Sequence, residues 1–238
     1  MYKIEVRLAV AVLGLMAAPL LFGQVSAVAP ANASSNAIAA DPVLSVNPVT
    51  GLAAVSQRDY HPLTAEQRWQ LYWRQNYLSV GAYFGPVFTS LVLDQSTGSP
   101  SQWGGGVHGY ALRVASRTAS GVLQGTVQAS LAAGLHEDVR YISSQDAGFG
   151  KRTLHAIAFS FLTYNDQGHV TLNVANLVAL YATTAISTTW LPGRLNASGY
   201  TLTNGTAQVA LAVPVNILQE FWPDIRRRIG RHRGDAIQ

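Results

Sequence analysis

The sequence predicts an all-α fold, a single bundle of about five to six helices around one long Gly/Ala-rich helix. Two observations support this prediction. Aromatic and apolar residues recur at helical spacing directly after a capping motif at residues 64–67. Small residues recur every four positions across residues 105–133, and side chains four apart stand above one another on a helix. The chain has no cysteine, so packing without disulfide bonds must hold the fold together.

The 238 residues divide into four segments of different composition. Residues 1–27 combine a basic start, the apolar run 8–22 and small residues before a cleavage position. This is typical of a signal peptide, with an uncleaved N-terminal anchor as the alternative. Residues 28–60 are rich in Ala, Ser, Asn and Pro without a sustained period, and predict a flexible low-complexity linker. Residues 61–225 contain the helical domain, and residues 226–238 form a basic C-terminal tail.

The predicted signal peptide indicates an exported protein of the cell envelope, in the periplasm or associated with the outer membrane. The formal net charge is +4, but residues 61–225 contain eight basic and eight acidic residues and are neutral. The tail carries five arginines. A domain without a basic stripe excludes nucleic acid as its partner. The tail suits anionic lipid headgroups, or it is simply a solubilising end.

The domain opens with a helix, because Thr64 and Gln67 match a T-x-x-Q capping box. The aromatic face of this helix predicts either core packing or a membrane-interface belt. Residues 81–93 are apolar and uncharged, and Gly85-Pro86 within them predicts a short or kinked helix. The aromatic residues at helical spacing are Trp69, Tyr72, Trp73 and Tyr77.

Residues 103–141 predict one long helix in which Arg113 and Arg117 interrupt the row of small residues. Each glycine inside a helix costs about 1 kcal/mol relative to alanine. Repeated glycines therefore predict close approach of a neighbouring helix, as in membrane bundles. A glycine-rich soluble bundle is the alternative. The expected helix-packing positions are Gly105, Gly109, Gly121 and Gly125.

Three further helices are expected over residues 153–164, 170–190 and 202–222. The alternation in "HVTLNV" and a hairpin signal at Asn204-Gly205 leave an outer-membrane β-barrel as the alternative fold. The long uncharged runs in this half are rich in Thr, Asn, Ser and Gln, which makes them marginal membrane spans. Membrane association is expected, and whether any helix spans a bilayer stays open.

The stretch "HEDVRYISSQDAGFGKR", residues 136–152, contains most of the candidate catalytic residues. A zinc motif H-E-x-x-H would need histidine where Arg140 stands, so no metal site is predicted here. No G-x-S-x-G elbow occurs in the sequence. The remaining enzymatic interpretation is general acid–base catalysis by a histidine and a carboxylate. No cofactor is predicted. The weak catalytic candidates are His136, Glu137, Asp138 and His155.

A structural interpretation accounts for more of the charges. Scarce charges among apolar residues are usually paired where they are buried, and the arginine fork can hold two carboxylate oxygens. We expect Arg152 to join Glu220, with Asp138 or Glu137 as a further partner, and so to fix helix register. Solvated helix ends are the alternative. The expected ion-pair network comprises Arg113, Arg117, Asp138, Arg140, Arg152, Glu220 and Asp224.

Six short motifs follow one another along the domain: "FGPVF", "QWGGGVHGYALR", "LHEDVRY", "GFGKRTLHA", "NDQG" and "NILQEFWPDI". Together they resemble a family of uncharacterised, exported, helix-rich bacterial proteins best known from acidobacterial genomes. The resemblance covers most of the folded domain and implies an all-α fold without an assigned activity. Val139 departs from the family pattern, in which Pro or Asn often stands between the Asp and the Arg.

These features predict a non-catalytic, membrane-associated protein of the cell envelope with a structural or scaffolding role. A carrier of lipid or another apolar ligand is the second hypothesis. An envelope hydrolase that uses His136 or His155 with Glu137 or Asp138 is the third. Membrane lipids are the expected partners, and a homo-oligomer stays open.

Overall fold

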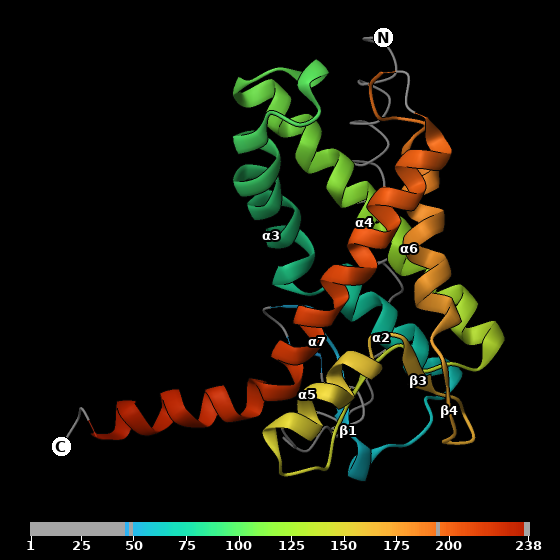
Figure 1. Ribbon diagram of the computed structural model, residues 1–238, viewed down its shortest axis with the longest axis vertical. Helices are drawn as coiled ribbons and strands as arrows, with labels where there is room; N and C mark the ends of the chain where they lie inside the picture. Colours follow the sequence, from blue (N-terminus) through green and yellow to red (C-terminus); the bar gives the residue numbers. More distant parts are fainter. Residues whose placement is uncertain (1–45, 48–49, 194–195, 236–238) are drawn as a thin grey trace, which may run out of the picture.

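Six α-helices and two pairs of short strands occur in the part of the chain that the computed structural model describes, residues 46–47, 50–193 and 196–235. The predicted signal peptide of residues 1–27 lies outside the described residues. Helices dominate the fold (Figure 1), so the all-α prediction holds in its coarse form, with the strand pairs as a minor addition.

Helix α2, Ala65–Asn76, begins at the predicted capping box. The Gln67 backbone N–H donates to Thr64 Oγ1 at 3.2 Å, and the Thr64 N–H donates to Gln67 Oε1 at 3.0 Å. The aromatic face of this helix is not the core. Leu71 is fully buried, whereas Trp69 is 59% exposed and stacks on its aromatic neighbours at the surface.

Helix α3, Val80–Thr89, continues directly into the π-helix η3, Ser90–Gln95. The Ser79 hydroxyl caps α3 by accepting the Ala82 N–H at 3.2 Å. Pro86 lies inside α3 without ending it, and the wider π-helical turns follow four residues later. We call α3 and η3 together, residues 80–95, the apolar arm.

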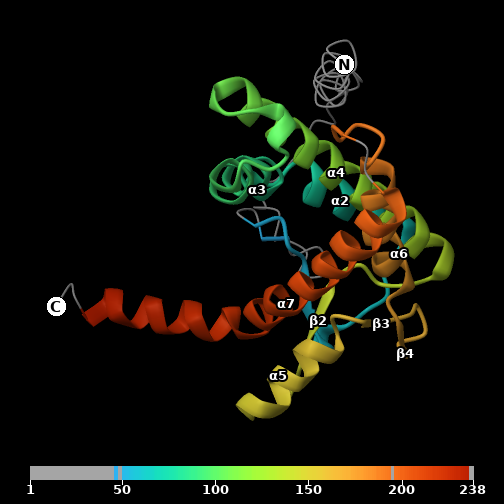
Figure 2. The same cartoon turned by 45° about the horizontal axis from the view of Figure 1, so that its top comes forward.

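Helix α4, Gly106–Leu135, is the long central helix, with α3 on one side and α6 on the other (Figures 1 and 2). It is shorter than the predicted helix of residues 103–141. His136 adopts the left-handed conformation with φ of 57°, which a continuing helix cannot accommodate. The helix therefore ends before Glu137.

Other parts of the chain approach closely at only two of the four glycines that were expected to mediate helix packing. A Cβ at Gly125 would lie 1.9 Å from the Asn76 side-chain oxygen of α2. A Cβ at Gly109 would lie 2.7 Å from the carbonyl oxygen of Trp103. Gly121 has open space around its Cβ position, and Gly105 precedes the helix as its N-cap.

Two alanine substitutions on α4 should therefore have opposite effects. Gly125→Ala should lower the free energy of unfolding by about 1–3 kcal/mol, because the new methyl group overlaps Asn76. Gly121→Ala should raise it by about 0.5–1 kcal/mol, because alanine loses less backbone entropy in a helix. Chemical denaturation measures both. Equal effects of the two substitutions would contradict the packing described here.

The two strand pairs lie near one end of the bundle (Figure 1). Strand β1, Ala54–Ser56, pairs in parallel with β2, Tyr141–Ser143, and β3, Leu162–Tyr164, pairs antiparallel with β4, Val170–Leu172. Part of the expected linker therefore joins the fold, and Ala53 belongs to the small apolar core cluster. Strand β4 also replaces the first turn of the helix predicted from residue 170.

The remaining helices are α5, Phe149–Ala158, α6, Val174–Ser187, and α7, Ala197–Asp235. Asn204 and Gly205 lie within α7, so the hairpin signal there does not form a turn. Helix α7 packs along α6 and then turns away from the bundle (Figure 1), with Pro214 and Pro223 inside it. It continues past residue 225 into the predicted tail.

None of the helices in the described part of the chain combines the length and the apolar character that crossing a membrane requires.

Polar side chains are buried in this fold, and many large apolar side chains are exposed. Arg113 and Glu220 are each 1% exposed, and Asp138 is 2% exposed. The buried apolar cluster contains only small and medium side chains around Leu71. Proteins in water usually bury large apolar residues and rarely bury charges fully. A proposed function therefore has to explain why charged side chains are buried and large apolar side chains are exposed.

Candidate functional site

The three adjacent polar residues of the charged stretch diverge from one another. Glu137 caps the start of α6, where its carboxylate accepts the Val174 N–H at 3.2 Å and the Ala175 N–H at 2.8 Å. A carboxylate is favoured there by the free N–H groups and the dipole of the helix. His136 points to a different element, as described below. Glu137 therefore stabilises the fold of α6.

Asp138 forms a fully buried ion pair with Arg140. Arg140 Nη2 lies 2.6 Å from Asp138 Oδ2, and the Arg140 backbone N–H donates to Asp138 Oδ1 at 2.8 Å. Arg140 Nη2 also donates to the His61 carbonyl at 2.7 Å. Burial, with a smaller contribution from the Asp138 charge, raises the pKa of the adjacent Tyr60 hydroxyl to about 12. The pair ties the charged stretch to the segment before α2.

Arg152 joins α5 to α7. Its guanidinium lies 2.8 Å from Glu220 Oε1 and 2.6 Å from Asp224 Oδ2, and it also donates to the Glu220 carbonyl. The ring of Phe221 lies 4.4 Å from the Arg152 Cζ. Hydrogen bonding by Arg152 holds the pKa of the Asp224 carboxyl below its usual value.

Glu220 is the centre of this group, which we call the Arg152–Glu220 lock (Tyr141, Ser144, Arg152, Glu220 and Asp224). Glu220 Oε2 accepts the Tyr141 hydroxyl at 2.8 Å and the Ser144 N–H at 3.0 Å. Burial and then the hydrogen bond to Glu220 raise the pKa of the Tyr141 hydroxyl, which keeps this donor protonated. The lock therefore fixes α5, β2 and α7 in one register.

The other predicted network members do not join this lock. The predicted pairing of Arg152 with Glu137 or Asp138 does not form, because both carboxylates have other partners. Arg117 pairs with Asp94 of η3 at 2.5 Å. Arg113 pairs with no carboxylate in the described structure. It is surrounded by oxygen acceptors, namely the carbonyls of Ser99, Pro100 and Gly104 and the side chain of Gln95.

His155 also has a structural role. Its Nε2 lies 2.8 Å from the Ile142 carbonyl oxygen, which can only accept, so this nitrogen carries the proton. The imidazole ring stacks on Phe159 with 4.1 Å between centroids. His155 therefore connects α5 to β2 and pairs with neither Glu137 nor Asp138.

His136 is the one catalytic candidate that is exposed, at 73% of its side chain. Its Nδ1 lies 2.9 Å from Asp166 Oδ2, and Asp166 Oδ1 accepts Arg68 Nη2 at 2.6 Å. These residues border an open groove of about 560 Å³ between α2 and α4, lined also by Trp69, Tyr72, Trp73, Ala129 and Ala133.

The groove also contains a hydroxyl group, but it does not complete a catalytic arrangement. Ser130 lies in the lining, and its Oγ donates to the Thr126 carbonyl at 2.8 Å instead of to His136. A nucleophile within hydrogen-bond reach of its base is the mark of covalent catalysis. In the described residues, no cluster of three or more His, Asp or Glu side chains could hold a metal ion.

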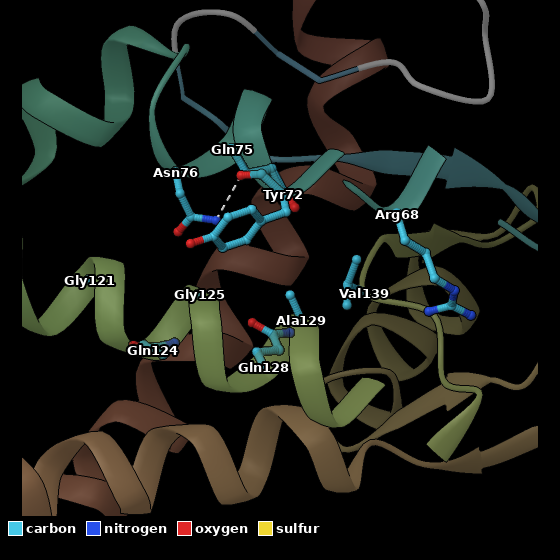
Figure 3. Close-up of a pocket in the computed structure, with 10 residues that line it drawn as sticks. All are labelled: Arg68, Tyr72, Gln75, Asn76, Gly121, Gln124, Gly125, Gln128, Ala129 and Val139. Carbon is cyan, nitrogen blue, oxygen red and sulfur yellow. Dashed lines mark hydrogen bonds between the residues drawn. The ribbon is translucent and has the colours of Figure 1, made fainter. Parts of the chain in front are cut away.

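A second cavity, of about 280 Å³, adjoins this groove between α2 and α4 (Figure 3). Its lining includes the side chains of Gln75, Gln124 and Gln128 together with Ala129 and Val139 (Figure 3). The Asn76 side chain lies against Gly125 of α4, and its amide donates to the Tyr72 carbonyl of its own helix at 2.9 Å. The same three glutamines line a further cavity towards α6 and α7.

The apolar arm exposes large apolar side chains along its length and carries no charge before its last turn. No charged residue occurs between Arg74 and Asp94. The aromatic cluster of α2 lies at its base, where the Tyr83 hydroxyl donates to the Tyr77 carbonyl at 2.9 Å. Eight large side chains of the arm are exposed: Val80, Tyr83, Phe84, Val87, Phe88, Leu91, Val92 and Leu93.

No protein-family model, curated protein or solved structure matches this chain. Its function has to be inferred from its own geometry. The sequence places Asp166 among the carboxylates that balance the arginines, but its partners Arg68 and His136 were not expected. Asp94 was not expected to form an ion pair. The signal for it is its isolation at the end of a long uncharged run.

Proposed function

We propose that this protein is a non-catalytic, membrane-associated protein of the cell envelope, in which the apolar arm contacts the acyl chains of a bilayer. The observation that carries the proposal is the exposure of eight large apolar side chains on one helical segment that has no charged residue before Asp94. Contiguous apolar surfaces of this kind mark interaction sites. Moving one such side chain out of water contributes about 1.5–3 kcal/mol.

The surroundings of the arm support lipid as its partner. The ten α-helical residues of α3 extend about 15 Å, which matches the thickness of one leaflet, and η3 lengthens the arm further. The tryptophans and tyrosines of α2 lie at the base of the arm, and such residues favour the headgroup region. The signal peptide predicted at residues 1–27 favours the cell envelope as the location.

The buried ion pairs fit the same function. Charges within a protein that contacts lipid are expected to face its interior and to pair with one another. The Asp138–Arg140 pair and the Arg152–Glu220 lock follow this rule. The pair ties the charged stretch to the segment before α2, and the lock joins α5, β2 and α7. The arginines at the end of α7 add attraction to anionic headgroups.

Flotation with vesicles of phosphatidylethanolamine and phosphatidylglycerol tests this function. The full chain should float with the vesicles at high salt, because burial of the arm does not depend on charge. Phe84→Ser with Phe88→Ser should reduce the partition coefficient at least roughly tenfold, since two buried aromatic rings are lost.

The matched control is Leu154→Ser with Ile157→Ser, which removes two exposed apolar side chains from α5. This control should float like the unchanged protein. If high salt releases the unchanged protein from the vesicles, the arginines of α7 account for binding and the proposal for the arm is wrong.

A second candidate function is supported by the groove beside His136. Its aromatic and alanine side chains suit an apolar ligand, and its volume of about 560 Å³ is in the range of small-molecule sites. Lipid that stays bound to the purified protein and is lost in Trp73→Ala would support a carrier. Unchanged lipid content in that variant would exclude this groove as the site.

A further inference from the structure

The last part of α7 leaves the bundle. Helix α7 packs against α6, α5 and β2, and its final turns then extend away from these elements as one helix (Figures 1 and 2). We call residues 222–235 the α7 extension. The Arg152–Glu220 lock holds α7 through Glu220 and Asp224, directly where the extension begins. The lock therefore fixes the direction in which the extension leaves the bundle.

The α7 extension is strongly basic. Residues 226–235 contain five arginines and one aspartate, a net charge of +4. Arg226 and Arg227 are exposed, the latter at 70% of its side chain. Asp224, the acid directly before them, is shared between Arg152 and Arg227. Its carboxylate therefore offsets only part of this charge, and the extension presents a net positive surface.

Apolar residues recur at helical spacing among these arginines. Trp222, Ile225 and Ile229 follow one another three and four positions apart, the spacing that groups residues on one side of a helix. Trp222 is 37% exposed, and Ile225 is partly exposed. Arginines alone would suit any polyanion. A basic helix that also carries tryptophan and isoleucine along one side is typical of helices that lie at a membrane surface.

The direction of the extension fits a bilayer that holds the apolar arm. The extension runs across the axis of α3 in Figure 1, and Figure 2 shows it lengthwise while α3 is seen nearly end-on. It leaves the bundle at the end where the strand pairs lie and where α3 begins (Figure 1). This step rests on the proposed function. If α3 enters a bilayer along its axis, a helix across that axis lies parallel to the bilayer surface, on the side of the headgroups.

We propose that the α7 extension is a second membrane contact, which lies in the headgroup region and binds anionic phospholipid. Its arginines pair with the lipid phosphates, for which the guanidinium fork is suited. Trp222 and Ile225 enter the boundary between headgroups and acyl chains. Contact through the arm does not depend on lipid charge, whereas contact through the extension does. The two contacts together make the protein select bilayers that contain anionic lipid.

Flotation at low salt tests the extension separately from the arm. The full chain carries Phe84→Ser and Phe88→Ser, which weaken contact through the arm. We expect this chain to float with vesicles of phosphatidylethanolamine and phosphatidylglycerol, but not with vesicles of phosphatidylethanolamine and phosphatidylcholine. High salt should abolish the binding, because it screens the charges. Equal flotation with both kinds of vesicle, or with neither, would overturn the proposal for the extension. Neither outcome decides the function of the arm, which flotation of the unchanged chain at high salt tests.

Further substitutions in this chain locate the contact. Arg226→Gln with Arg227→Gln should weaken binding about twentyfold, since each arginine near an anionic surface contributes about fivefold. Trp222→Ser should weaken it about tenfold. The matched control, Arg58→Gln with Lys151→Gln, removes two exposed cations outside α7 and should leave binding unchanged. An equal loss in the two double variants would show that net charge alone causes binding and would overturn the site. Binding of a short DNA duplex as tightly as the vesicles, unaffected by Trp222→Ser, would overturn the choice of lipid.

Discussion

Arg140→Met should lower the free energy of unfolding by about 3–5 kcal/mol, because it leaves the Asp138 carboxylate buried without its cation. Asp138 is 2% exposed and cannot recover the lost interaction from water. The substitution also removes a donor from the His61 carbonyl. The loss is a large share of the roughly 5–15 kcal/mol that stabilises a typical domain. Denaturant titration of the purified chain measures it.

Two comparisons show whether burial causes this loss. Arg227→Met removes an exposed arginine that pairs with Asp224 three residues away, and it should cost less than about 1 kcal/mol. Asp138→Asn combined with Arg140→Met should recover part of the stability, because no charge is left unpaired. Equal costs for Arg140→Met and Arg227→Met would contradict a structural role of the buried pair.

Glu220→Ala should cost a similar amount, about 3–5 kcal/mol, because Glu220 is the common acceptor of the lock. The substitution leaves the Arg152 guanidinium with one carboxylate, and it leaves the Tyr141 hydroxyl and the Ser144 N–H without their acceptor. We expect the melting temperature to fall strongly, with the contact between α5 and α7 lost first. Proteolysis within α5 should increase accordingly.

The control for this prediction is Asp224→Ala, which removes the second carboxylate of Arg152. Asp224 is more exposed than Glu220, so water replaces much of the interaction and the cost should be about 1 kcal/mol or less. A larger loss in Asp224→Ala than in Glu220→Ala would show that the lock is not centred on Glu220.

Local signals in the sequence predicted the helices well. The capping box at Thr64 and the short helix with Pro86 depend on neighbouring residues alone, and both occur in the structure. The end of α4 gave no such signal. Glycine is the usual left-handed residue after a helix, but here His136 adopts that conformation, so the predicted helix extended too far.

Contacts between distant parts of the chain were harder to predict. Each strand has three residues, and β1 forms only because β2, more than eighty positions later, provides its partner. The scarcity of charges correctly drew attention to Arg152 and Glu220, which the structure brings together. The same signal did not show that Asp138 lies outside this group. Asp138 pairs with Arg140, two residues further along the chain.

The direction of the apolar faces was the least predictable feature. A helical pattern shows which residues share a face, but placing that face inside the bundle assumes that water surrounds the protein. Here Trp69 and the arm residues Phe84 and Phe88 face outward, while Glu220 and Arg113 are buried. The outward direction of Phe84 and Phe88 is the one expected if lipid covers the arm, as we propose.

Site-directed spin labelling of the arm tests that account most directly. The chain has no cysteine, so Phe84→Cys and the control Leu154→Cys each provide one labelling site. Both positions are exposed, on the arm and on α5 respectively. In vesicles of phosphatidylethanolamine and phosphatidylglycerol, the label at position 84 should become accessible to oxygen and shielded from a water-soluble nickel chelate. The label at position 154 should stay accessible to nickel. Equal nickel accessibility at both positions would contradict insertion of the arm into lipid.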